Sequence, residues 1–210
     1  VQTYHTFFED YLHLYLPIIP KKIARGIARF ISKRQCNAVD AIVAPSQPML
    51  DVLREYGVKS KAEVVPTGLQ AHSFKKSNGA EFRKKHGIDE NRPVGLFVGR
   101  VAFEKNISFL LRMWTEVIKQ QPDALLVIAG EGPAEASLHA LAKTLHLENH
   151  VKFIGYMDRN TELNACYVSA DVFVFSSLSE TQGLVLLEAM AQATPVVAIA
   201  ELGTKSILIE

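Results

Sequence analysis

Residues 171–188 read DVFVFSSLSETQGLVLLE, and this stretch contains the repeating unit of the fold together with two acidic residues. Four apolar residues follow Asp171, which predicts a buried strand over 171–175. A serine-rich turn comes next, and the apolar run 183–193 predicts a helix. Glu180 lies just beyond the strand and Glu188 lies inside the helix. Because phosphates favour the N–H groups at a helix start and carboxylates accept hydrogen bonds from hydroxyls, the stretch suits a ligand that carries both phosphates and hydroxyls.

The same alternation of strand and helix recurs from residue 94 to the end of the chain. The strands are continuous apolar runs, which indicates burial on both faces, and their alternation with helices predicts βαβ units in a parallel sheet. We therefore expect an α/β fold, a Rossmann-like parallel sheet with helices on both faces. The expected strands are 94–98, 124–129, 151–154, 171–175, 195–199 and 206–209, and the expected helices are 107–119, 134–145, 162–169 and 183–193.

The amino-terminal part of the chain is organised differently. Strands are predicted over 40–44 and 62–65, with a helix over 48–56 between them. Residues 66–92 are rich in Lys, Gly, Pro and Asn and contain one short helix near 80–86. We therefore assign residues 1–66 to the carboxyl-terminal part of a preceding domain, 67–92 to a linker, and 93–210 to a ligand-binding domain that is truncated at its end.

Composition limits the classes of function. The chain has 210 residues, 48% of them hydrophobic, and a net charge of +1, which argues against a general nucleic-acid binder. Cys36 and Cys166 are isolated, so we expect reduced thiols and a cytoplasmic protein without a metal site. No apolar run reaches the roughly 20 residues that span a bilayer. Because the chain begins at Val1 and ends on an expected strand, we expect a fragment of a longer protein.

Two cations flank the loop after the first strand of the later domain. Gly99 and Arg100 end that strand and Lys105 precedes the next helix. A guanidinium fork and an ammonium at one strand-to-helix loop can both meet a diphosphate. The alternative is a solvated loop. The nearby Gly130-Glu131-Gly132-Pro133 could let a nucleotide approach the backbone, although a tight turn before a helix explains it equally well.

The candidate acids and the candidate histidine each have a structural alternative. Glu180 could be a solvated turn residue and Glu188 a surface charge on its helix. The helix around Glu188 is apolar nearly all round, however, so its carboxylate needs a partner or a ligand. His5 lies in an aromatic-rich segment and could equally be structural.

Residues 21–34, KKIARGIARFISKR, predict a basic amphipathic helix without an acidic residue. At 100° per residue, Ile23, Ile27, Phe30 and Ile31 share one face, and Lys22, Arg25, Arg29 and Lys33 lie opposite. Such a helix suits the surface of an anionic membrane. The alternative is that the Ile and Phe side chains pack on the protein core.

Together these segments resemble the retaining GT-B glycosyltransferases of family 4, also called glycosyltransferase group 1. The resemblance runs along nearly the whole chain and ends in the Glu180–Glu188 stretch. The amino-terminal TYHTFFEDYLH also resembles a segment of the diacylglycerol glucosyltransferases. The segments that carry the family resemblance are VAPS (43–46), VPTG (65–68), GR (99–100) with KN (105–106), GEGP (130–133), VKFIG (151–155), ADVFV (170–174) and EAMA (188–191).

The resemblance implies two Rossmann-like domains, the second of which holds a nucleotide-sugar donor such as UDP-glucose. Arg100 and Lys105 would bind its diphosphate, with the backbone near Gly99, Gly183 and Leu184. Glu180 would contact the transferred sugar as a catalytic residue, and Glu188 would bind the ribose. His5 would be the active-site histidine of the first domain. The loop after Gly155 would lie near the base.

The implied reaction is the transfer of a sugar, with retention of configuration, to a membrane lipid or a saccharide. The family usually needs no metal, and the chain has no Asp-x-Asp motif, so we expect no cofactor. We expect the fragment alone to bind donor without turnover, and the whole protein to lie on the inner face of the membrane. Two alternatives stay open: a nucleotide-sugar epimerase of the same architecture and a non-catalytic module that binds nucleotide-sugar or membrane.

Overall fold

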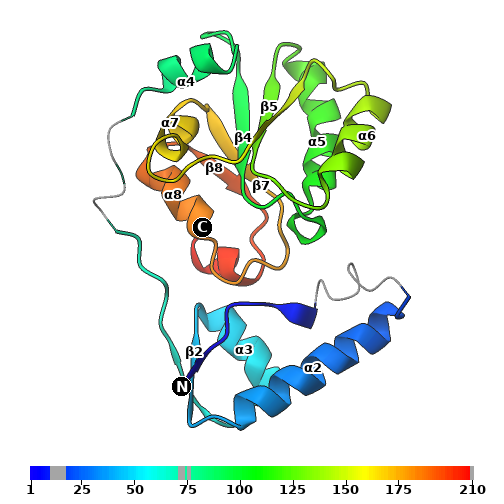
Figure 1. Cartoon of the computed structure of the whole chain (residues 1–210), viewed down its shortest axis with the longest axis vertical. Coiled ribbons are helices and arrows are strands. Elements are labelled where there is room, and N and C mark those ends of the chain that lie inside the picture. Colours follow the sequence, from blue (N-terminus) through cyan, green and yellow to red (C-terminus); the bar gives the residue numbers. More distant parts are fainter. Residues whose placement is uncertain (10–17, 71–73, 75–76, 209–210) are drawn as a thin grey trace. The chain divides into compact units, whose positions relative to one another are not determined.

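The computed structural model describes residues 1–9, 18–70, 74 and 77–208. The chain forms two compact units (Figure 1), of which unit 1 comprises Val1–Gly68, Leu178–Gly183 and Ala200–Glu210. Unit 2 comprises Leu69–Ser177 and Leu184–Ile199. Each of the two carries its own parallel sheet, so the expected α/β fold is confirmed.

Unit 2 contains a five-stranded parallel sheet in the order β6-β5-β4-β7-β8. The strands are β4 (Val94–Val98), β5 (Leu125–Ala129), β6 (Val151–Gly155), β7 (Val172–Phe175) and β8 (Val196–Ala198). Every residue of the neighbouring strands β4 and β5 is buried, as their continuous apolar sequences predict. The five strands expected within residues 94–199 are therefore confirmed, each to within two residues at its ends.

The helices of unit 2 follow the strands in the expected alternation. They are α4 (Gly79–Lys85), α5 (Ile107–Gln120), α6 (Glu135–Thr144), α7 (Leu163–Val168) and α8 (Leu184–Ala191), with a short 3₁₀ helix, η2 (Phe103–Lys105), before α5. Figure 1 shows α5 and α6 on one side of the sheet and α7 and α8 on the other. Because β6, β5 and β4 are parallel neighbours, the loops that follow them lie together at the carboxyl edge of the sheet.

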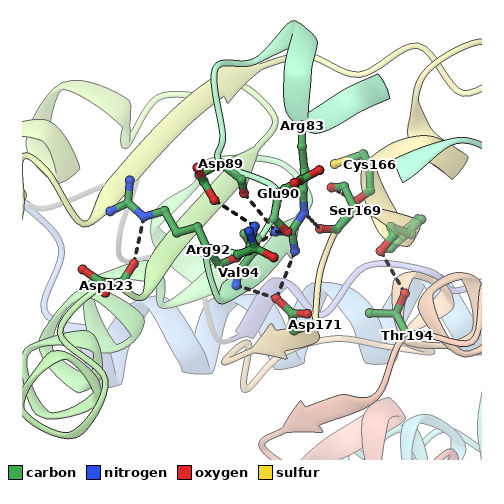
Figure 2. Close-up of polar contacts among 12 residues, drawn as sticks. Arg83, Asp89, Glu90, Arg92, Val94, Asp123, Cys166, Ser169, Asp171 and Thr194 are labelled. Atoms are coloured by element: carbon green, nitrogen blue, oxygen red, sulfur yellow. Dashed lines mark hydrogen bonds and ion pairs between the residues drawn. The ribbon is translucent and has the colours of Figure 1, made fainter. Parts of the chain in front are cut away.

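Helix α4, expected within the linker, belongs to unit 2, and its buried Arg83 bonds to the segments around it. The Arg83 guanidinium donates to the carbonyl oxygens of Ser169 at 2.7 Å and of Arg92 at 2.7 Å, and it pairs with Asp171 at 3.0 Å (Figure 2). It also donates to the carbonyls of two residues in the turn after α4. Asp171 in turn accepts a hydrogen bond from the backbone N–H at the start of β4. Residues 79–92 thus pack as part of unit 2.

Unit 1 contains a three-stranded parallel sheet in the order β1-β2-β3. The strands are β1 (Gln2–Thr3), β2 (Ala41–Ala44) and β3 (Lys61–Val64), and the helices are α2 (Lys21–Asn37) and α3 (Gln47–Glu55). Its core gathers buried side chains from α2, β2 and α3, together with Tyr4 just after β1 and Leu202, and Ala62 of β3 packs against this core. The two-residue β1 is too short to leave a periodic signal in the sequence.

The strand expected over 206–209 is wrong for the residues that the structure describes, and Ile209 lies outside them. Leu202–Ser206 form a 3₁₀ helix, η3, and the N–H groups of Ile207 and Leu208 both donate back to the Thr204 carbonyl. Gly203 packs so tightly that an added Cβ would lie 2.2 Å from the Thr181 carbonyl carbon. The apolar run alone reveals neither the helical turn nor this close packing.

Helix α2 forms as predicted, but its apolar face does not pack on the core. Its buried residues are the small ones, Ala24, Ala28, Ser32 and Cys36, because small side chains let the helix approach its neighbours closely. The Ile and Phe stripe remains exposed, with Phe30 at 63%. Within the described residues, the stripe therefore does not pack on the core. No helix within the described residues is both long and apolar enough to cross a membrane.

Candidate functional site

A cavity of about 340 Å³ lies at the carboxyl edge of the unit 2 sheet, where β4, β5 and β6 end. We call it the sheet-edge cavity. Its size is at the lower end of the range for small-molecule sites, and its position is where ligands bind open α/β sheets. The cavity is lined by Val98, Gly99, Arg100, Ala129, Gly130, Glu131, Tyr156, Met157, Arg159 and Leu163.

Glycine at position 130 allows two strand ends to meet beneath this cavity. Gly130 has φ of 136°, and a Cβ added to it would lie only 1.9 Å from the carbonyl oxygen of Gly99. Any side chain at this position would force the loop after β4 away from the loop after β5. At these two glycines the cavity is lined by backbone atoms without side chains, so a ligand can approach the backbone closely.

Arg100 reaches the cavity from the end of β4, and a buried glutamate holds it there. Its guanidinium bonds to the carboxylate of Glu104, which belongs to η2. The Arg100 side chain is 56% exposed whereas that of Glu104 is 5% exposed. The buried partner holds the arginine through one of its five N–H donors.

Lys105 is placed differently from Arg100. It ends η2 and is not among the residues that line the cavity, and its ammonium lies 5.9 Å from the centre of the Phe175 ring. The η2 turn is fixed by β7, because Ser176 Oγ donates to the carbonyls of Lys105 and Asn106 at 3.1 and 2.9 Å. The structure thus assigns Arg100 to the cavity and places Lys105 beside the aromatic end of β7.

Glu188 lies on α8 with its side chain 4% exposed, and both of its carboxylate oxygens have a partner. Arg159 Nη1 donates to Oε1 at 2.5 Å, and the Tyr167 hydroxyl donates to Oε2 at 2.9 Å. Burial, and then the neighbouring carboxylate, raise the pKa of Tyr167 well above its ordinary value. The expectation that this glutamate needs a partner is met by two side chains that the sequence did not single out.

The loop that carries Glu180 belongs to unit 1. Ser46 Oγ donates to the Thr181 carbonyl at 2.7 Å, and Thr181 Oγ1 donates to the His5 carbonyl at 3.0 Å. The Gln182 side chain accepts from the Thr67 N–H at 3.0 Å and donates to its carbonyl at 2.8 Å. Glu180 is half-buried and His5 is exposed. These bonds join the segments of the two candidate catalytic residues within one unit.

The candidate residues therefore divide between the two units. Among the catalytic and donor-binding candidates, unit 1 contains His5, Glu180 and Gly183, whereas unit 2 contains the others. Gly183 has φ of 85°, so the position strongly favours glycine at the turn into α8. The candidates in unit 2 are Gly99, Arg100, Lys105, Leu184 and Glu188.

Within the part of the chain that the structure describes, Arg25 and Arg29, two of the four cations proposed for a membrane surface, lie beside an acidic side chain. Glu9, which is buried, accepts a hydrogen bond from Arg29 at 2.7 Å and one from the Tyr56 hydroxyl, and Arg25 lies 3.9 Å away. Burial by itself would raise the pKa of Glu9, but the hydrogen bonds from Arg29 and Tyr56 outweigh it and lower the pKa. Lys22 and Lys33 are exposed.

Neither a metal cluster nor a disulfide is found among the described residues. No group of three His, Cys, Asp or Glu side chains in the described ranges could hold a metal ion. Cys36 and Cys166 are free and buried, and burial raises the pKa of both thiols. They are therefore unreactive core residues.

Two family models match the chain and between them account for nearly all of it. The model described as "Glycosyl transferases group 1" matches residues 78–210, and the model described as "Glycosyltransferase Family 4" matches residues 1–72. The boundary between the two matches, within residues 72–78, falls inside the expected linker.

Curated relatives and solved structures give the same picture. The alpha-monoglucosyldiacylglycerol synthase of Streptococcus pneumoniae is 36% identical over 94% of this chain and 45% of its own length. The enzyme of the same name from Acholeplasma laidlawii is 27% identical over 94% of this chain and 51% of its own. The structure of a sucrose-phosphate synthase from Thermosynechococcus elongatus superposes with a TM-score of 0.78 at 26% identity, over 99% of this chain and 51% of that one. The chain thus spans about half the length of the relatives it matches.

Proposed function

Because this chain belongs to the group 1 glycosyl transferases, we propose that the whole protein transfers a sugar from a nucleotide-sugar donor to a membrane lipid, with retention of configuration. The donor is UDP-glucose or a close analogue. In this reaction the bond between the anomeric carbon and the diphosphate oxygen breaks, and its electron pair leaves with the diphosphate. The acceptor hydroxyl oxygen bonds to the same carbon on the same face, and its proton goes to the departing diphosphate.

The observation that carries this proposal is the sheet-edge cavity, which is lined by Arg100 together with the backbone of Gly99 and Gly130. A fixed guanidinium stabilises the charge that develops on a departing diphosphate, and it needs no reorganisation to do so. Lys105 and the amides at the start of α8 would add to that stabilisation. Glu188 would bind the ribose, and Glu180 and His5 would contact the transferred sugar.

Exposed side chains on α2 support a lipid acceptor. Phe30 and three isoleucines are exposed on the same helix as Lys22 and Lys33, and an apolar stripe beside cations suits an anionic membrane surface. The two curated relatives named above are synthases of a glucosylated diacylglycerol by name. We therefore place the acceptor in a membrane and the protein on its inner face.

Donor binding is tested by a thermal-shift panel of UDP-, GDP- and ADP-sugars with this chain. A ligand that binds the native state alone raises the melting temperature, by RT ln(1 + [L]/Kd) in free-energy terms. UDP-glucose should raise it and glucose alone should not, and Arg100→Gln should reduce the shift. A flat panel with folded protein would overturn the proposal of donor binding.

Membrane binding is tested by flotation with vesicles that do or do not contain an anionic lipid. The chain should float with anionic vesicles, and Phe30→Ser and Lys22→Glu should each reduce the floated fraction. Lys143→Glu, an equal charge change on an exposed position of α6, is the matched control and should have no effect. Flotation without any nucleotide-sugar binding would instead identify a non-catalytic membrane module.

Catalysis is tested separately from binding. We expect this chain to bind donor without turnover, and we expect the transferase activity of the longer protein to persist in EDTA, since the proposed stabilisation of the diphosphate uses arginine, lysine and backbone amides. Sugar transfer by this chain alone, or activity that EDTA abolishes and a divalent cation restores, would contradict these two expectations.

A further inference from the structure

The proposed function assigns ribose binding to Glu188, yet the Glu188 carboxylate already accepts two hydrogen bonds. Arg159 holds Oε1 at 2.5 Å and Tyr167 holds Oε2 at 2.9 Å, and the side chain is almost completely buried. A ribose hydroxyl that donates to this carboxylate must therefore share or displace one of the two partners.

Arg159 is the partner that can leave. Its side chain is 62% exposed, whereas Tyr167 is 1% exposed and fixed inside the unit. The backbone beside Arg159 is held by Asp158, whose carboxylate accepts from the N–H groups of Asn160 and Thr161 at 2.9 and 3.0 Å. The arginine side chain can thus change partner while its loop keeps its conformation.

Arg159 and Arg100 line the same cavity, although they come from the loops after two different strands, β6 and β4. Each is paired with a buried glutamate, Glu188 for the first and Glu104 for the second. Arginine forms forked hydrogen bonds with phosphate, and a nucleoside diphosphate would bring phosphates to the end of β4 where Arg100 stands. Arg159 is the second guanidinium within this cavity.

We propose that Arg159 is a donor-binding residue that exchanges partners when the nucleotide enters. The inference rests on the proposed function. The ribose hydroxyls replace Arg159 on Glu188 Oε1, and the released guanidinium binds a phosphate of the diphosphate. Each charge keeps a partner throughout, so the buried carboxylate is never left without a hydrogen bond. In the ligand-free protein, Arg159 therefore competes with the ribose, and in the complex it contributes to the phosphate site.

This exchange predicts opposite effects on nucleoside and nucleotide. The dissociation constants of uridine, UMP and UDP would be measured for the wild-type chain and for Arg159→Gln, by ligand-observed NMR for the weak ligands and by calorimetry for UDP. Uridine should bind the variant as tightly as the wild type or more tightly, because the competitor is gone. UDP should bind at least tenfold more weakly, with UMP between the two, and Arg159→Lys should recover part of the UDP affinity.

Two matched variants separate this role from simple support of Glu188. Tyr167→Phe removes the other hydrogen bond to the carboxylate, so it should weaken uridine and UDP by the same factor. Arg112→Gln removes an equal charge from an exposed position on α5 and should change neither. Far-UV circular dichroism and the fluorescence of Trp114, which is buried in unit 2, check that each variant is folded.

An equal change in affinity for uridine, UMP and UDP in Arg159→Gln would overturn the exchange, and so would unchanged UDP affinity. If the wild-type chain binds no UDP, the proposed function itself fails and the exchange fails with it. If the wild type binds UDP and only the Arg159 result is flat, the proposed function stands and the exchange is wrong.

Discussion

Each unit buries a glutamate between an arginine and a tyrosine, and the cluster in unit 2 contributes its arginine to the lining of the sheet-edge cavity. In unit 1, Glu9 is held by Arg29 and the Tyr56 hydroxyl. In unit 2, Glu188 is held by Arg159 and the Tyr167 hydroxyl. The three residue types and the hydrogen bonds they make are the same in both clusters.

The difference lies in what the arginine does beyond the glutamate. The Arg29 guanidinium lies over the Tyr56 ring at 5.5 Å, so it contacts both other members of its cluster. Arg159 instead extends into the lining of the sheet-edge cavity. We therefore associate the Glu188 cluster with a candidate binding site, because its arginine lines the cavity.

The largest expected effect is on the affinity for UDP, which should depend on the Glu188 cluster and not on the Glu9 cluster. Glu188→Ala should weaken UDP binding by roughly 30- to 150-fold, because hydrogen bonds to a charged group contribute about 2–3 kcal/mol. Glu9→Ala should leave the affinity within about twofold. Calorimetry with UDP measures both. Normal UDP affinity in Glu188→Ala would show that Glu188 has no part in donor binding and that the two clusters are alike.

The second expected effect is on stability and concerns the cluster in unit 1. Glu9→Ala should lower the free energy of unfolding by about 2 kcal/mol, since it removes a charge-assisted bond and leaves the buried Tyr56 hydroxyl without its acceptor. Urea denaturation followed by far-UV circular dichroism measures the loss. Glu116→Ala, which removes an exposed glutamate paired with Lys119, is the control and should cost less than about 0.5 kcal/mol. Equal losses in the two variants would show that the Glu9 cluster does not stabilise unit 1.

The sequence predicted the sheet of unit 2 because its strands carry a strong local signal. A continuous apolar run such as Val94–Val98 can be stable only when both of its faces are buried, and each run is followed by a helix of sufficient length. The glycine and arginine at the end of that strand were found for the same reason, since the carboxyl ends of parallel strands meet at one edge.

The clusters could not be predicted, because their members are far apart in the sequence. Glu9 and Tyr56 are 47 positions apart, and Glu188 and Arg159 are 29 apart. Nothing local marks which arginine meets which glutamate. The packed face of α2 was equally hidden, since its contact is made by small residues such as Ala24 and Ala28 while the stronger apolar signal, that of Ile23 and Phe30, is exposed.

A smaller effect is expected from each tyrosine hydroxyl. Tyr56→Phe and Tyr167→Phe should each cost about 1 kcal/mol of stability, because each removes one buried hydrogen bond and little volume. Only Tyr167→Phe should also weaken UDP binding, by about threefold, since its hydroxyl orients Glu188. Urea unfolding and UDP titration of the same two proteins test this. A change in UDP affinity in Tyr56→Phe would argue that the unit 1 cluster also contributes to donor binding.

The smallest expected effect is the pH dependence of the Glu9 cluster. Burial raises the pKa of Glu9, but its hydrogen bonds to Arg29 and Tyr56 prevail, so its pKa lies below the ordinary 4.5. As the pH falls through 4.5 and then through the lower native pKa, the unfolded chain binds a proton first, and the stabilisation from Glu9 is lost.

Tyr56 makes the stability depend on pH on the alkaline side. Burial and then the bond to Glu9 raise its pKa above the ordinary 10.0, so above pH 10 the unfolded chain ionises first and stability falls again. Glu9→Gln should therefore flatten the acid side of a plot of unfolding free energy against pH, and Tyr56→Phe should reduce the slope of the alkaline side. Tyr167 has a raised pKa as well, and so have the buried thiols of Cys36 and Cys166, so part of the alkaline slope should survive in Tyr56→Phe and the double variant Tyr56→Phe/Tyr167→Phe should reduce it further. An acid side that is unchanged in Glu9→Gln would mean that Glu9 does not link protonation to folding, and the likeness between the two clusters would then extend no further than their geometry.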